Sequence, residues 1–188
     1  GLRGDLADTH TTFAYTDLIV PPGNFFTRFI PTDMDISVAV DDLPVHELAD
    51  MFFDLLLREP EPGGMVLDDP FAEVGDRILE ALTAAGTRFH LDRIFVDGAS
   101  FMLDASGTAW PDAGAALGAR SELRFEIGGL EELAVLLSLA GDASTDAVRS
   151  LLFELGEPVT DASGRSTRRY ELAVLADGSI LLNGRNLA

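Results

Sequence analysis

The chain has 188 residues and a formal net charge of −19, from 32 acidic against 13 basic residues. Such a charge repels nucleic acid and anionic lipid surfaces at long range, so we expect no nucleic-acid partner. Hydrophobic residues make up 47% of the chain, enough for a folded core, and the absence of cysteine excludes disulfides, thiolate zinc sites and cysteine nucleophiles.

The N-terminal segment predicts a short strand and then an aromatic cluster. Residues 1–12 are expected to be a loose lead-in, whereas Ala14–Val20 has the composition of a short strand ended by a Pro-Pro-Gly turn. Phe25, Phe26 and Phe29 follow between turn signals. These rings either plug one end of the core or form an apolar lip at a binding groove.

Residues 33–57 predict a strand that runs directly into a helix. Apolar residues alternate from Met34 to Val40, which is the period of a half-buried strand in an antiparallel sheet with one wet face. After Pro44, which suits a first helical position, the apolar spacing becomes helical as far as Leu56.

A loop, a second helix and a hairpin complete this first unit. The loop at 58–69 is rich in Pro, Gly and acids, and its last residue, Asp69, is the expected N-cap of a helix that ends at Gly86. The hairpin spans Thr87–Trp110, and Asp97-Gly98 predicts its tight turn.

In the first strand of this hairpin, the apolar residues switch from odd-numbered to even-numbered positions. Phe89 and Leu91 share one face, whereas Ile94 and Val96 fall on the other. A bulge near Asp92-Arg93 would return all four side chains to the same face, and we therefore predict one there.

Residues 121–187 repeat the order of the first unit. Apolar residues alternate over 121–127, and a helix starts after a Gly-Gly pair at Leu130. A further helix, capped by Ser144, and a hairpin that turns at Asp177-Gly178 follow.

These elements predict one domain over residues 1–188, of the α+β class, with a curved antiparallel sheet and helices on one face. It is built from two strand–helix–helix–strand–strand repeats, about 33–110 and 121–187, with Leu43 aligned with Leu130. Two or three strands are marginally stable alone, so the two copies are expected to share one core.

Motifs that would indicate catalysis are missing from the sequence. It contains no nucleophile elbow, zinc-protease helix, Walker loop or dinucleotide-binding fingerprint. Asp33 and Asp35 share a strand face and could hold calcium, but 32 acids make such pairs common by chance. We therefore expect no metal and no cofactor.

The runs LRFEIGGLEELAVLL at 123–137 and YELAVLADGSILLNG at 170–184 resemble the bacterial envelope family catalogued as domain of unknown function 2125. The run DISVAVDDLP at 35–44 is similar to the same family's pattern. The resemblance implies a longer periplasmic protein with an inner-membrane anchor outside this sequence. It also extends distantly to AsmA-type envelope proteins, with their lipid-handling sheets, and it brings no catalytic residues.

We expect a non-enzymatic module of the cell envelope that binds a lipid or a protein partner. The expected site is a concave apolar space between the sheet and the helices, and its expected ligand-binding residues are Phe25, Phe26, Phe29, Phe52 and Phe53. One alternative is a scaffold or interaction domain with a filled core and no ligand. The other is a hydrolase that uses a pair of acids.

Overall fold

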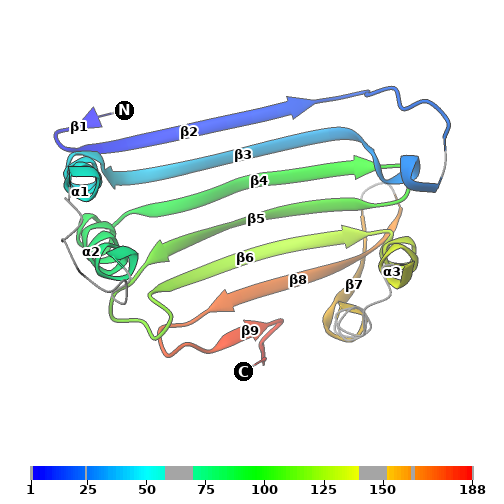
Figure 1. Cartoon of the computed structure of the whole chain (residues 1–188). Helices are drawn as coiled ribbons and strands as arrows, with labels where there is room; N and C mark the ends of the chain where they lie inside the picture. The colour runs from blue at the N-terminus through cyan, green and yellow to red at the C-terminus, as the bar shows by residue number, and fades with distance from the viewer. Residues whose placement is uncertain (1, 24, 58–69, 140–151, 162–163, 188) are drawn as a thin grey trace, which may run out of the picture.

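The computed structural model describes residues 2–23, 25–57, 70–139, 152–161 and 164–187. In this part the chain forms an open antiparallel sheet of ten strands with helices at its ends (Figure 1). The α+β class and the antiparallel sheet are therefore confirmed.

The strands follow one another across the sheet almost in chain order. In sheet order they are β1 (Leu2–Arg3), β2 (Leu6–Tyr15), β3 (Pro31–Pro44), β4 (Arg88–Gly98), β5 (Met102–Pro111), β6 (Ala119–Gly128), β8 (Ser166–Val174), β9 (Ile180–Leu182) and β10 (Arg185–Asn186), and β7 (Glu157–Thr160) pairs with β8 beside this path. The helical elements are the 3₁₀ helix η1 (Phe25–Phe29) and the α-helices α1 (Val45–Leu57), α2 (Pro70–Ala85) and α3 (Leu130–Leu139), and residues 152–155 are also helical.

The helices lie at the two ends of the strands. α1 and α2 follow β3 at one end, and α3 follows β6 at the other, because β3 and β6 run in opposite directions (Figure 1). At the first end the hydroxyl of Thr83 in α2 accepts the backbone N–H of Ala113 at 3.2 Å. At the other end the hydroxyl of Tyr170 donates to the carbonyl of Leu152 at 2.7 Å. The described helices therefore cover the sheet only near its ends.

A bulge keeps the apolar residues of β4 on one face. β3 pairs Ser37 with Arg93 but Val38 with Leu91, so Asp92 is an extra residue in β4. The same extra residue separates Leu91 from Ile94 in the pairing with β5. The bulge predicted near Asp92-Arg93 is confirmed, and it aligns the two halves of the strand.

The predicted position of the first strand is wrong. The structure places β2 at Leu6–Tyr15, whereas the residues from 16 to 20 that were expected in a strand form none. Residues 9–14 of β2 are all exposed. An exposed strand of this kind carries little apolar alternation, so period alone did not reveal it.

The two Asp-Gly pairs have different roles. Asp97 and Gly98 both belong to β4, and the hairpin turns after them, where the Gly98 N–H donates to the Phe101 carbonyl at 3.0 Å. The tight turn predicted at Asp97-Gly98 is therefore wrong by one or two positions. Gly178 does lie in the turn between β8 and β9, with a φ of 86°, as predicted.

The second predicted helix is confirmed as α2, and Gly86 ends it with a φ of 72°. A positive φ of this kind is easiest for glycine, which has no Cβ to clash. Asp69 and Ser144, the predicted N-caps, lie outside the described residues.

The strand-to-helix junctions of the two predicted repeats have a common backbone feature. Aligning Leu43 with Leu130 places Asp42 opposite Gly129, and both have a positive φ, 53° and 72° respectively. In both units a strand that follows the helices pairs with the strand before them, β4 with β3 and β8 with β6, but in the second unit β7 comes first and pairs with β8.

The complete repeat is nevertheless not confirmed. The two units follow each other in the same order across the sheet, while β3 and β6 run in opposite directions. To superpose the first unit on the second, a rotation must reverse the direction of β3 and keep the order of the strands across the sheet. Such a rotation exchanges the two faces of the sheet. The apolar residues of both units nevertheless lie on the same face. The order of elements is therefore shared, but the paired units do not superpose with their apolar faces aligned.

Leu130 tests the packing of α3. Its side chain is only 4% exposed, whereas Val38 is 39% exposed. We expect Leu130→Ala to lower the free energy of unfolding by roughly 2–4 kcal/mol, because it leaves a cavity. Glu131→Ala and Val38→Ala should each cost less than about 1 kcal/mol in urea unfolding. A larger effect of Glu131→Ala than of Leu130→Ala would contradict this packing.

Tyr170 tests the contact at the far end of the sheet. Its ring is 0% exposed and stacks on Phe125 at 4.8 Å, and burial raises the pKa of its phenol. We expect Tyr170→Phe to lower the free energy of unfolding by roughly 0.5–1.5 kcal/mol, because the Leu152 carbonyl loses the hydroxyl donor and keeps only the Gly156 N–H at 3.2 Å.

The same variant should change the response to alkaline pH. Because the folded-state pKa of Tyr170 lies above the unfolded value of about 10, the stabilisation is complete below that value and is lost as pH rises through the folded pKa. The wild type should therefore lose more stability than Tyr170→Phe above about pH 10. Tyr15→Phe is the matched control, and equal pH profiles for the wild type and Tyr170→Phe would count against a buried phenol.

Candidate functional site

One face of the sheet carries almost only apolar side chains from β2 to β9. Residues that pair directly across an antiparallel sheet point to the same face, so the strand register defines its members. We call this set the apolar face; it consists of Thr9, Thr11, Phe13, Tyr15, Met34, Ile36, Val38, Val40, Phe89, Leu91, Ile94, Val96, Leu103, Ala105, Gly107, Ala109, Ser121, Leu123, Phe125, Ile127, Arg168, Tyr170, Leu172, Val174, Ile180 and Leu182.

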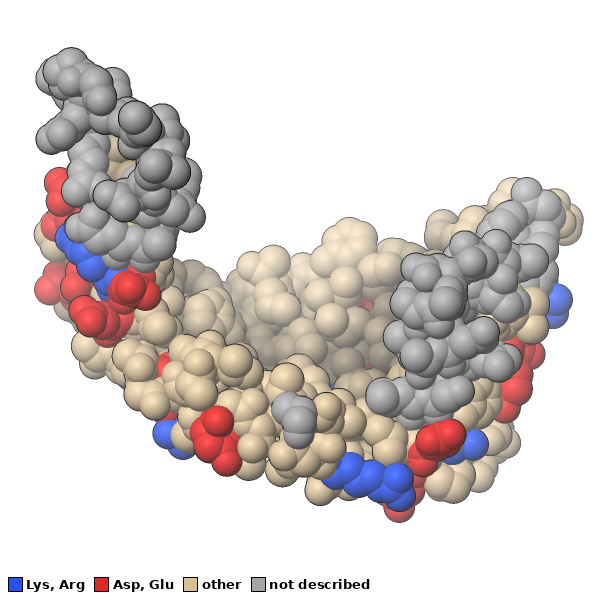
Figure 2. Space-filling model, turned by 60° about the horizontal axis from the view of Figure 1, so that its bottom comes forward, with Lys and Arg blue, Asp and Glu red and all other residues tan. Residues whose placement is uncertain are grey.

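The apolar face lines a trough. Figure 2 shows a hollowed molecule: where the described residues are visible, its inner surface is almost entirely uncharged and the charged residues lie on the outer surface. The strand register explains this distribution, because Asp35, Asp104, Glu126 and Arg169 lie in one row on the opposite face. We call that outer surface the polar face.

Among the described residues, no core fills the trough. Among the residues of the apolar face, only Tyr170 and Leu182 are buried. Phe13 is 58% exposed, and Val38 and Phe89 are each 39% exposed. Large exposed apolar surfaces of this kind mark sites for ligands or partners, whereas isolated exposed apolar residues do not.

The sequence-predicted site residues do not lie together. Phe52 and Phe53 belong to α1 at one end of the strands, where each is 58% exposed and their rings meet edge-to-face at 6.2 Å. Phe29 belongs to η1 at the opposite end and stacks on Phe101 at 6.4 Å (Figure 1). Phe25 and Phe26 are also in η1, but their side chains lie outside the described structure.

The part of the trough that β2 contributes was not predicted from the sequence. Phe13 and Tyr15 extend the apolar face to the edge of the sheet, and their rings meet edge-to-face at 6.1 Å. The available signal was the alternation of larger side chains in Thr9–Tyr15, which the threonines conceal. The missed residues therefore belong to the strand whose position was also wrong.

Arg168 is the charged member of the apolar face, and its charge is turned to the end of the trough. Its Nη1 donates to the carbonyls of Phe153 and Gly156 at 2.8 and 2.9 Å. Its guanidinium also lies over the Phe153 ring, 5.3 Å from the ring centre. These contacts occupy the cation, so the middle of the trough stays uncharged.

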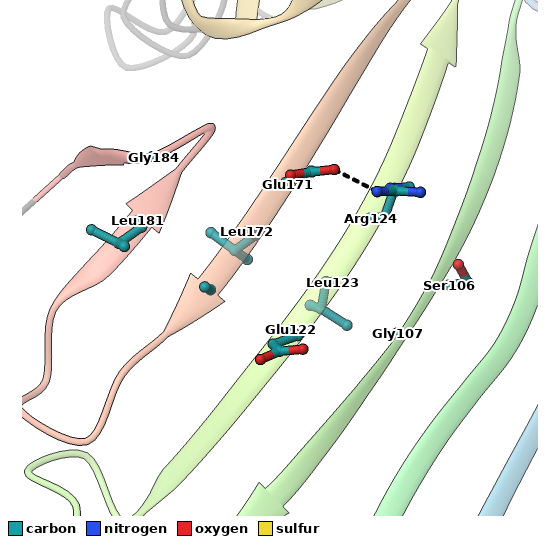
Figure 3. Close-up of a pocket in the computed structure, with 10 residues that line it drawn as sticks. Ser106, Gly107, Glu122, Leu123, Arg124, Glu171, Leu172, Leu181 and Gly184 are labelled. Atoms are coloured by element: carbon teal, nitrogen blue, oxygen red, sulfur yellow. Dashed lines mark hydrogen bonds and ion pairs between the residues drawn. The ribbon is translucent and has the colours of Figure 1, made fainter.

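The polar face carries a shallow hollow of about 460 Å³ between β5, β6, β8 and β9 (Figure 3). Arg124 and Glu171 point toward one another across it and form an ion pair at 2.6 Å. Both side chains are more than half exposed, so solvent screens this pair. Because the two charged side chains of this hollow already pair with each other, the hollow is a weaker candidate for a ligand site than the trough.

A second hollow on the polar face, of about 480 Å³, contains further arginines that are also paired. Arg165 bonds to Asp97 at 2.6 Å and to Asp161 at 2.8 Å, and these hydrogen bonds raise the pKa of Arg165. Arg169 pairs with Glu126 at 3.3 Å. The contacts of Arg165 tie β4 to the loop after β7, and the pair of Arg169 with Glu126 ties β8 to β6.

The acid pair considered for calcium is engaged by protein groups. Asp33 accepts the hydroxyl of Thr32 at 2.9 Å and the backbone N–H of Asp17 at 3.2 Å. Asp35 pairs with Arg93 at 3.5 Å. Within the described ranges, no three His, Asp or Glu side chains lie close enough together to hold a metal ion.

No helix in the described part of the chain is both long and apolar enough to cross a membrane. Comparisons with protein-family models, with curated proteins and with solved structures find no match to this chain.

Calcium tests the acid pair. We expect neither EDTA nor millimolar calcium to shift the melting temperature by more than about 1 °C, because an ion that binds only the folded state would raise it by mass action. Sodium chloride at equal ionic strength is the control, since any salt screens the net charge of −19. A rise of many degrees with calcium alone, abolished by Asp33→Asn, would establish a site.

Proposed function

We propose that this protein is a non-enzymatic lipid-binding module that holds acyl chains against the apolar face. The observation that carries the proposal is the open trough, in which Val38 and Phe89 are 39% exposed in the middle of a paired sheet. A surface of this kind gains free energy from any apolar occupant that displaces water.

The dimensions of the trough suit an acyl chain. The apolar face crosses seven strands, β2 to β6, β8 and β9. At about 4.8 Å for each of the six spacings, it is roughly 29 Å long across the strands. The acyl chains of one bilayer leaflet span about 15 Å, so an extended chain fits within it.

The chemistry of the trough also favours an acyl chain over a polar ligand. The strand ladders satisfy the backbone groups beneath it, and its side chains offer few hydrogen-bonding groups. A sugar or nucleotide would lose its hydrogen bonds to water there without replacement. Several strand acids on the polar face are paired with arginines, as in Glu126 with Arg169 and Asp35 with Arg93, which favours binding over acid-pair hydrolysis.

The charge of the chain favours a lipid without net negative charge. At −19, the protein repels anionic headgroups and anionic membrane surfaces. A zwitterionic phospholipid avoids this repulsion. Apolar residues of α1, among them Phe52 and Phe53, stand exposed at the strand ends that border one side of the trough, where a lipid would enter.

The cellular setting and the repeat are part of the proposal. The resemblance of 123–137 and 170–184 to the envelope family supports a periplasmic location, with a membrane anchor outside this sequence. The shared positive φ of Asp42 and Gly129 supports an origin of 33–110 and 121–187 from one repeated unit.

An interaction module without a small ligand is the second candidate. It is favoured by the long unpaired edge of β2, which offers backbone groups to another strand. A filled core would have favoured this candidate alone, but the trough is open.

Lipid binding can be tested on opposite faces of a single strand. We expect native mass spectrometry of freshly purified protein to detect a co-purified lipid, and a fluorescent phosphatidylcholine to bind. Val38→Lys places a charge in the trough and should weaken binding roughly tenfold or more. Ser37→Lys, its neighbour on the polar face, is the matched control and should bind like the wild type.

Circular dichroism melts of both variants show whether the fold is kept. Equal binding by Val38→Lys and Ser37→Lys, with both folded, would show that the lipid is not in the trough. Absence of any bound lipid in the wild type, together with no binding of the probe, would contradict the proposed function.

A further inference from the structure

β2 leaves most of one edge of the sheet unpaired. On its outer side, β1 pairs only with Leu6 and Ala7. Thr9–Tyr15 pairs with β3 on the inner side, and among the described residues no strand lies on its outer side (Figure 1). Every second residue of Thr9–Tyr15 therefore presents its backbone N–H and C=O groups to solvent along this edge.

This edge lacks the features that normally prevent strand pairing. The segment THTTFAY contains no proline and no lysine, and it contains no acid although the chain has 32. The only irregularity in its pairing lies before it, between Ala7 and Thr9. A long, regular and nearly uncharged edge is a template for another strand.

The opposite edge of the sheet is built differently. It is divided between β7, β9 and β10, which have four, three and two residues. These short strands offer no matching edge for a head-to-tail contact. An edge that can pair only with its own equivalent gives a closed twofold dimer and not a filament.

We propose that a second copy of this chain pairs with this one along β2, antiparallel and centred on Thr12. Thr12 is the midpoint of Thr9–Tyr15, and this register sets Thr11 opposite the partner's Phe13 and Thr9 opposite the partner's Tyr15. The twofold axis is then perpendicular to the sheet, so both copies present their apolar faces on the same side.

Two features exclude a slip of one residue. A register centred between Thr12 and Phe13 sets Asp8 opposite the partner's Asp17, which brings like charges together. It also places Phe13 beside Thr12, so that the apolar face of one copy continues the polar face of the other. The register centred on Thr12 sets Asp8 opposite the partner's Thr16 and keeps the apolar face continuous.

The dimer would join two troughs edge to edge. Phe13, which is 58% exposed, gains cover from the partner's Thr11 at the joint. The inference rests on the strand edge and not on lipid binding, so it stands or falls separately from the proposed function.

Cysteine cross-linking tests the register, because the chain has no native cysteine. In the proposed dimer, Thr12→Cys faces its own equivalent at about 4.5–5.5 Å between Cβ atoms, close to disulfide geometry. Thr11→Cys is the matched control, because its equivalent lies on the diagonal at about 7–8 Å. We expect mild oxidation to give a covalent dimer with Thr12→Cys and little with Thr11→Cys.

A lysine at the same position tests whether the dimer depends on this edge. We expect the wild type to be dimeric at micromolar concentrations in light scattering and in native mass spectrometry. Thr12→Lys sets two like charges opposite each other and should weaken the dimer roughly tenfold or more. Thr160→Lys changes an exposed threonine of β7 in the same way and should leave the dimer intact.

Three results would overturn the proposal. The first is a wild type that is monomeric in both measurements. The second is a dimer that persists in folded Thr12→Lys, and in particular one that Val38→Lys breaks, since the apolar faces would then be the contact. The third is equal cross-linking of Thr11→Cys and Thr12→Cys, which would exclude this register.

Discussion

The structure depends on a strand register that places the apolar side chains of seven strands on the same face of the sheet. Each strand turns alternate side chains to opposite faces, so a single error in register would exchange the faces from that point on. The pairing of Val38 with Leu91, and of Leu123 with Leu172, keeps one row of aliphatic side chains aligned across the sheet. The bulge at Asp92 is what allows β4 to join this row with both of its halves.

The ends of the sheet are fixed by a few specific contacts. At the junction of β6 and α3, a Cβ on Gly129 would collide with the carbonyl oxygen of Ser100, so the close approach of the two segments requires glycine. Leu130 is then buried at the start of α3. Tyr170 is buried at the same end and donates to the carbonyl of Leu152. The ends are closed by packing and hydrogen bonds, while the middle is left open.

The open face and the open edge attract different chemistry. The interior strands have their backbone groups paired, so the trough offers apolar side chains alone and favours an occupant that needs no hydrogen bonds. The outer side of β2 offers unpaired backbone groups, and it favours another strand. On the polar face, ion pairs such as Arg124 with Glu171 and Arg169 with Glu126 occupy the charges. Binding is therefore directed to the face and the edge that offer no free charge, since Arg168, the charged member of the apolar face, is bonded at the end of the trough.

The amino-acid sequence by itself determined the elements with a strong period. The alternation of Met34 to Val40, the helix that ends at Gly86, and the bulge near Asp92 follow from local pattern and backbone chemistry. The presence of an apolar face followed from the same alternation. Local pattern could not place β2, because an edge strand is exposed and its sequence need not alternate.

Only the tertiary structure decided how these elements combine. Phe29 and Phe52 were expected at one site, but the strand directions carry η1 and α1 to opposite ends of the sheet. The similar order of elements in the two halves indicated a repeat, whereas the strand order shows that the paired units cannot superpose with their apolar faces aligned. The sequence also could not predict that the apolar face is exposed. Periodicity identifies which side chains share a face, but not whether other residues cover that face.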